Sequence, residues 1–395
     1  MTEILNQFRD EDLPPSTVDV SGAVLAGRRR RVRARFAAGA VALAVGGATV
    51  PLLISARPGP NPPPPAACIS PQPTGSSAPT LPTAGTWQRF DPLTSEIDAT
   101  GVEGYRVTSV TTSMYEQLVT LERTGADRED GAPGFVMIQL FACEGVPYMF
   151  DDDQAVPFDP GTGGPAEEIG GAPAYWLPPN KALPRGSISE GLAWQWIHGA
   201  WALVVAGPDP GAPTPDPIVL RTTAAQVAPQ LRLGAGTPVK SPISMPVPDG
   251  MYPLFTQTGV TSDFGQGFPD LFTIGFNTIG RAEPTNPFVS DYVPSLTVGA
   301  SSLAKLEDRP GNATEYSENL GFPAFQAVHD YGTQEVDALL VYEFFGFGMD
   351  LMPVDIPGAS TKAERLSRAA DVFRTITVYP GAATDASAWG DPIVP

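Results

Sequence analysis

Cysteine and histidine, the residues that most often hold metals or serve as nucleophile and base, are scarce in this sequence. Its 395 residues include two cysteines, Cys68 and Cys143, and two histidines, His198 and His329. A His-x3-Cys-x2-Cys zinc pattern is therefore absent, and no Gly-x-Ser-x-Gly turn for a serine nucleophile occurs. We accordingly expect a protein that is not an enzyme and that has no cofactor and no metal site.

Three short patterns bear on catalysis or ligand binding, and each is incomplete. Ser302-Leu303-Ala304-Lys305 has the Ser-x-x-Lys spacing of penicillin-interacting serine enzymes, but their Lys-Thr-Gly motif is missing. The run 151–153 is Asp-Asp-Asp without EF-hand spacing, which favours a solvated acidic loop. The Gly-rich run 161–164 has no strand before it and no Lys after it, which favours a plain turn over a phosphate loop.

Basic residues are fewer than acidic ones, 24 against 43, and the imbalance is uneven along the chain. Residues 1–35 carry a net charge of +2, whereas residues 58–395 carry 16 basic and 38 acidic side chains, a net of −22. A surface this acidic repels nucleic acids and anionic lipid head groups. We therefore expect no nucleic-acid partner.

Charged residues are missing altogether from one long stretch, Phe36–Ala56. Its 21 residues, at about 1.5 Å each, span the hydrocarbon core of a bilayer. A basic block precedes it, made of Arg28, Arg29, Arg30, Arg31, Arg33 and Arg35. Such a block stays on the cytoplasmic side, so we predict a signal anchor in the cell membrane with an extracellular C-terminal region. A signal peptide cleaved after Ala56 is the alternative, although its leading region would be long.

The composition divides the chain into five segments. We predict a cytoplasmic tail at 1–35, a transmembrane helix at 36–56, a disordered proline-rich linker at 57–85, and two extracellular repeats at 86–236 and 237–395. Small residues at 40, 44 and 48 would let two membrane helices form a homodimer, but an alanine-rich composition explains them equally well and is favoured.

The two cysteines lie on the predicted external side, where disulfides form. One bridge between Cys68 and Cys143 would tie the linker to the folded region. A buried thiol at Cys143, inside a strand-like run, is the alternative.

The external region repeats its own pattern. Alternating apolar residues predict strands at 105–110, 117–122 and 135–141. Three later patterns occur twice, and the matching pairs are 171–175 with 321–325, 192–196 with 340–344, and 224–227 with 369–372. They indicate a strand start, a hairpin and a helix, with Thr222-Thr223 and Ser360-Thr361 as candidate helix caps. The predicted fold class is α+β: one transmembrane helix and a duplicated extracellular domain of antiparallel sheet and helix.

Exposed tryptophans are the best candidates for a ligand surface. Trp194, Trp196 and Trp201 crowd one predicted hairpin, where they would stack on sugars or another ligand if one face stays exposed. Their alternating placement favours a role in the core, and an exposed ligand face is the alternative interpretation.

The N-terminal tail carries a resemblance. Acidic residues followed by Leu-Pro-Pro-Ser-Thr-Val-Asp-Val at 13–20, an arginine run and an Ala/Gly-rich span resemble many actinobacterial single-pass membrane proteins. Some relatives with this layout regulate extracytoplasmic-function sigma factors. The order of external elements is similar to that of RseB/LolA-like envelope domains, which implies binding on a curved sheet. These resemblances imply a sensor or regulatory protein that signals to a cytoplasmic partner through residues 1–35. A membrane-anchored binding or scaffolding module for lipid, glycan or protein is the alternative.

Overall fold

The computed structural model describes residues 88–124, 133–151, 154–179, 189–208, 215–259, 271–279, 294–301, 310–330 and 335–394. The first half of this region contains β1 (Thr94–Asp98), β2 (Tyr105–Ser113), β3 (Glu116–Arg123), β4 (Phe135–Phe141), β5 (Tyr148–Asp151), β6 (Gln154–Pro157), the 3-10 turn η3 (Pro160–Thr162), β7 (Gly164–Ile169), β8 (Ala172–Trp176), β9 (Glu190–Ile197), β10 (Ala200–Gly207), α2 (Pro217–Val227), the 3-10 turn η4 (Ala228–Gln230) and β11 (Arg232–Pro238). The second half contains β12 (Ile243–Ser244), β13 (Met251–Gly259), β14 (Leu271–Thr278), β15 (Leu296–Ser301), β16 (Thr314–Glu315), β17 (Ala324–Asp330), β18 (Glu335–Phe344), β19 (Phe347–Pro353), α3 (Lys362–Thr375), β20 (Thr377–Val378) and η7 (Ala386–Ala388).

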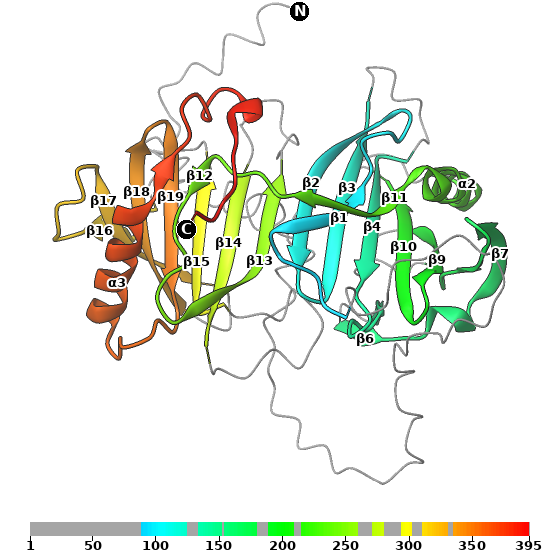
Figure 1. Cartoon of the computed structure of the whole chain (residues 1–395), viewed down its shortest axis with the longest axis horizontal. Coiled ribbons are helices and arrows are strands. Elements are labelled where there is room, and N and C mark those ends of the chain that lie inside the picture. Colours follow the sequence, from blue (N-terminus) through cyan, green and yellow to red (C-terminus); the bar gives the residue numbers. More distant parts are fainter. Residues whose placement is uncertain are drawn as a thin grey trace, which may run out of the picture.

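One antiparallel sheet of 14 strands runs through both halves of the described region (Figure 1). Outward from its centre the first half reads β2-β3-β4-β10-β9-β8-β7, and the second half reads β13-β14-β15-β19-β18-β17-β16. In each half the first three strands are neighbours, and the next four fold back so that the last lies beside the third. The helix follows that last strand in both halves. The sheet-rich α+β class expected from the sequence is confirmed.

Both helices lie on one face of the sheet, near its opposite ends (Figure 1). Beneath α2 the core is built from alternate residues of β3, β4, β9 and β10, and beneath α3 from alternate residues of β14, β15, β18 and β19. The short pairs β1–β11 and β12–β20 cover the same face between the helices. The hairpin β5–β6 covers the other face of the first half, where Tyr148 packs against Phe141. Period-two alternation in the strands supplies both faces.

The two halves meet where β2 pairs with β13, which we call the central seam. Two fully buried threonines, Thr112 and Thr256, lie opposite each other there, with 2.6 Å between their hydroxyl oxygens. Both hydroxyls also reach the carbonyl oxygen of Pro92, which precedes β1. A buried hydroxyl without a partner costs free energy, so these contacts hold the seam and the covering strand together.

The outer edges of the sheet are β7 and β16. Along β7 the exposed side chains include Pro165, Glu167 and Glu168. At the other edge β16 is two residues long. A proline lacks the amide hydrogen that strand pairing requires, and charged edge side chains oppose burial against another strand.

The N-terminal cap expected from the sequence is found for α3 but not for α2. Thr361 caps α3 as expected, and its hydroxyl accepts from the Glu364 amide while the Glu364 carboxylate accepts from the Thr361 amide. The expectation that Thr222-Thr223 caps the first helix is wrong. Asp216 is the cap of α2, with Pro217 at its first position, so both threonines lie inside the helix. An Asp-Pro start is as good a helix signal as a threonine.

The expected register between the two hairpins is wrong by one residue. The sequence match pairs Trp194 with Tyr342, yet Trp194 packs beneath α2 whereas Tyr342 lies on the other face of the sheet. Val341 takes the place that corresponds to Trp194, because it pairs with Ala324 as Trp194 pairs with Ala174. Side chains alternate between faces along a strand, so a slip of one residue reverses every orientation.

Several expectations fall on residues outside the described ranges. These are the basic block, the predicted membrane segment, the linker and Cys68. Within the described ranges, no helix has both the length and the apolar character needed to cross a bilayer.

Replacing Thr361 by alanine should lower the free energy of unfolding by about 1 kcal/mol, because the Glu364 amide loses its acceptor at the start of α3. Denaturant unfolding of the purified chain measures the change. Thr222→Ala is the matched control: Thr222 is exposed inside α2, where alanine is the better helix former, so no loss is expected. Equal losses in both variants would contradict this assignment of the caps.

Candidate functional site

A groove of about 390 Å³, lined by apolar side chains and by exposed backbone groups, opens on the helix face of the first half. We call it the Trp194 groove. Its walls come from the β7–β8 turn, the end of β9, the turn η4 and the start of β11, and its lining residues are Ile169, Gly170, Trp194, Trp196, Ile197, Ala228, Pro229, Leu231 and Leu233. The volume lies within the range of small-ligand sites. None of these side chains is ionisable, so the groove suits an uncharged group.

Two of the three tryptophans singled out from the sequence line this groove. Trp194 is 4% exposed and belongs to the core beneath α2. Trp196 is half-buried, its indole nitrogen donates to the carbonyl oxygen of Phe141 at 3.1 Å, and its ring lies 6.3 Å from that of Phe90. Trp194 is therefore mainly a core residue, as the core interpretation expects. The rings of Trp194 and Trp196 also line the groove.

The third tryptophan is not part of the groove. Trp201 lies on the opposite face of the sheet, where its ring meets Tyr175 at 6.1 Å. Residues that pair across β9 and β10 share a face, and Trp201 pairs with Gln195, not with Trp194 or Trp196. The three tryptophans therefore do not form one ligand face.

Aromatic side chains fill the corresponding place in the second half. Phe344 ends β18 as Ile197 ends β9, and Phe373 lies in the last turn of α3. Their ring centroids are 4.8 Å apart, and Phe322, next to the β16–β17 turn, lies 5.0 Å from Phe344. Three packed rings thus close the second half where the first half stays open.

Smaller side chains explain the opening in the first half. Ala172 lies two residues before Ala174 as Phe322 lies two residues before Ala324, and Val227 ends α2 where Phe373 lies in α3. These differences in side-chain size can be read from the sequence. They indicate a groove only after the residues of the two halves have been aligned correctly.

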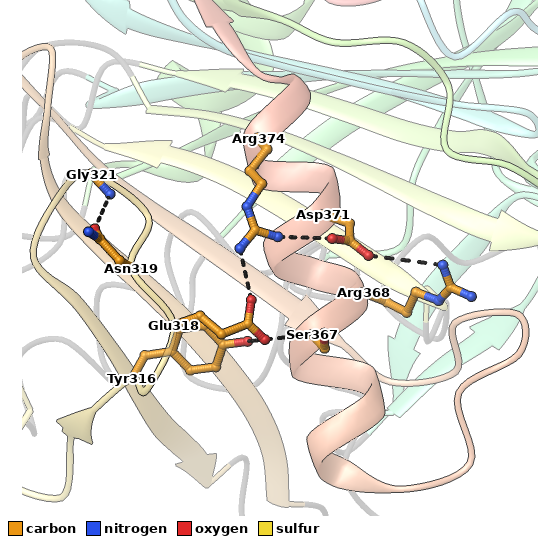
Figure 2. Close-up of polar contacts among 8 residues, drawn as sticks. All are labelled: Tyr316, Glu318, Asn319, Gly321, Ser367, Arg368, Asp371 and Arg374. Atoms are coloured by element: carbon orange, nitrogen blue, oxygen red, sulfur yellow. Dashed lines mark hydrogen bonds and ion pairs between the residues drawn. The ribbon is translucent and has the colours of Figure 1, made fainter.

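A network of polar and charged side chains joins the loop before Phe322 to α3 (Figure 2). Glu318, in the loop before Phe322, accepts from Arg374 of α3 at 2.8 Å, from the Tyr316 hydroxyl at 3.1 Å and from the Ser367 hydroxyl at 3.3 Å. These contacts tie the loop to the helix against which Phe322 packs. The network thus helps to keep the second half closed.

The same contacts shift three pKa values. Burial, and then the hydrogen bond to Glu318, raise the pKa of Tyr316 to about 12. The hydrogen bond that Arg374 donates to Glu318 lowers the pKa of the Glu318 carboxyl group and raises the pKa of the Arg374 guanidinium. All three groups therefore hold their ordinary charge at neutral pH, which fits a structural role.

The rim of the Trp194 groove is acidic on one side and neutralised on the other. Glu167 and Glu168 are exposed just before Ile169. Arg232, between two lining leucines, pairs with Asp98 at 2.7 Å. Among the described residues next to the lining, an anionic group would meet two carboxylates and an arginine already paired with Asp98, so an uncharged or cationic occupant is favoured.

The remaining sequence candidates lie elsewhere. Cys143 is half-buried in the turn after β4, not inside a strand as expected. His198 is exposed in the β9–β10 turn, and the Ser302–Lys305 pattern lies outside the described residues. The Gly-rich run begins with a 3-10 turn capped by the Asp159 carboxylate, which confirms the expectation of a turn.

Comparisons with models of protein families, with curated proteins and with solved structures gave no match for this chain. The interpretation of the site therefore depends on its own geometry.

Replacing Glu318 by glutamine should lower the pKa of Tyr316 from about 12, because the phenol loses a carboxylate that disfavours its anion. Arg374→Gln should raise it, since the guanidinium favours the phenolate. Ring-carbon NMR signals of labelled tyrosine, followed between about pH 9 and 13, report both shifts. A Tyr316 pKa that moves the same way in both variants would contradict the network.

Proposed function

We propose that this chain is a single-pass membrane protein whose external region binds an apolar ligand of the cell envelope without catalysing a reaction. The observation that carries the proposal is the Trp194 groove, open in the first half at the place where Phe322, Phe344 and Phe373 close the second half. Its lining side chains are apolar, and indole rings supply flat contact area at low entropic cost.

We also propose that the two halves are copies of one unit. A bulge follows Val107 in β2 and Pro253 in β13, positions that differ by 146. The same difference relates the buried residues of the helices, which are Leu220, Thr223, Ala224 and Val227 in α2 and Leu366, Ala369, Ala370 and Phe373 in α3. It also makes Thr111 pair with its own counterpart, Gln257, at the central seam. A residue that pairs with its counterpart marks a two-fold axis.

Duplication gives the groove a rationale. Once one copy supplies a closed and stable half, side chains in the other copy are free to become smaller. We therefore propose that the second half serves as the packed support and the first half as the binding half. Loss of apolar packing at such a site costs stability, which a function must justify.

Ile197→Phe copies Phe344 into the first half and should fill the Trp194 groove. We expect the amount of small molecule that copurifies with the variant from native membranes to be at least tenfold lower than with the wild-type chain. The denaturant midpoint of unfolding should stay equal or rise, because the new ring enters open space. Mass spectrometry of the bound fraction measures the loss.

Ile279→Phe is the matched control, since Ile279 is 66% exposed in the second half. It should leave the bound fraction unchanged. If no molecule copurifies with the wild-type chain, or if both variants retain the same molecule, the binding function is wrong.

The tail sequence favours a second candidate function, that of a sensor. Acidic residues, the 13–20 motif and the arginine block resemble tails of regulatory membrane proteins. In this proposal residues 1–35 hold a cytoplasmic partner, and occupancy of the external region alters that contact.

Deleting residues 1–27 should abolish the transcriptional response of the cell to envelope stress that depends on this chain. Membrane insertion should persist, because Arg28–Arg35 and the apolar segment remain. Transcript levels and membrane fractionation measure the two effects. A response that survives the deletion would leave the tail as a topogenic leader.

A further inference from the structure

The proline-rich linker joins the folded region beside the Trp194 groove. Gln88 is the first described residue, and its carbonyl oxygen accepts from the Glu144 amide at 3.2 Å. Two residues later, Phe90 is buried with its ring 6.3 Å from that of Trp196, a wall of the groove. The chain that precedes Gln88 therefore starts within a few residues of this wall.

The linker sequence next to that point has the chemistry of a polyproline ligand. Pro79-Thr80-Leu81-Pro82 is a Pro-x-x-Pro sequence, and five residues lie between Pro82 and Gln88. The six steps from Pro82 to Gln88 extend to roughly 19 Å at about 3.1 Å each. Grooves walled by aromatic side chains bind such segments, because a polyproline helix loses little entropy on binding.

Charge also suits this occupant. Residues 58–87 contain no ionisable acid or base apart from Cys68. The groove lining contains none, and its rim carries Glu167 and Glu168. A neutral segment meets no repulsion there and loses no ionic hydration on burial.

We infer that the Pro79–Pro82 stretch of this chain's own linker occupies the Trp194 groove when no ligand is bound, and that ligand displaces it. The inference rests on the binding function proposed above and adds its regulation. Displacement releases the linker, which leads directly to the predicted membrane helix. Occupancy of the groove is thereby coupled to the segment that holds the domain to the membrane.

A photo-crosslinking amino acid at Ala84, in the full-length chain in native membranes, tests the contact. The expected crosslinks join the linker to peptides that contain Trp194–Ile197 or Leu231–Leu233. Their yield should fall at least fivefold in the Ile197→Phe chain and stay unchanged in the Ile279→Phe chain. Crosslinks confined to other segments, or equal yields in both variants, would overturn the inference.

A second variant covers a misfolded Ile197→Phe chain. Pro79→Gly with Pro82→Gly leaves the groove intact and removes the prolines that favour a polyproline helix, so the crosslink yield should fall while affinity for the copurified ligand rises severalfold. Unchanged yield and affinity would overturn the inference. If a ligand copurifies but the crosslink does not form, the binding function stands and only the regulatory inference is wrong. If the crosslink forms but no ligand copurifies, the linker contact stands and the binding function is wrong.

Discussion

Pairing of β2 with β13 is the interaction on which the rest of the structure depends, because it turns two seven-stranded halves into one sheet. Thr112 and Thr256 meet there beneath Pro92, so the covering strand β1 is held at the same point as the two halves. Every other strand pair of the large sheet lies within one half. A change that opened this single ladder would separate two cores, each with its own helix.

The Trp194 groove follows from unequal packing on an equal framework. Strand order, bulge position and helix burial agree between the halves, while side-chain size differs at a few positions around the end of each helix. The loop that carries Phe322 is joined to α3 by the Glu318–Arg374 ion pair. The closed half therefore has both packed aromatic rings and an ion pair between the loop and the helix. The open half has alanine, valine and isoleucine at the corresponding places. Function is proposed for the difference between the halves because the shared framework explains only the fold.

Sequence patterns predicted the elements well and their detailed alignment poorly. Alternation located the early strands and both hairpins, and Ser360-Thr361 located the start of α3. Periodicity alone did not reveal that Trp194 corresponds to Val341. Both hairpins are rich in aromatic residues, so an alignment that pairs Trp194 with Tyr342 fits the sequence almost as well as the correct one. The same limit concealed the groove: its walls come from four separate elements, and Leu231 and Leu233 gave no local signal. Trp201 was grouped with its neighbours in sequence, yet the register across the hairpin sends it to the other face.

The borders of the sheet set its size. One border carries a proline and two exposed glutamates, and the other is a strand of two residues. A neighbouring molecule that approached either border would find too few aligned amide and carbonyl groups to add a fifteenth strand. That geometry keeps a wide sheet from growing into a fibre by edge-to-edge pairing.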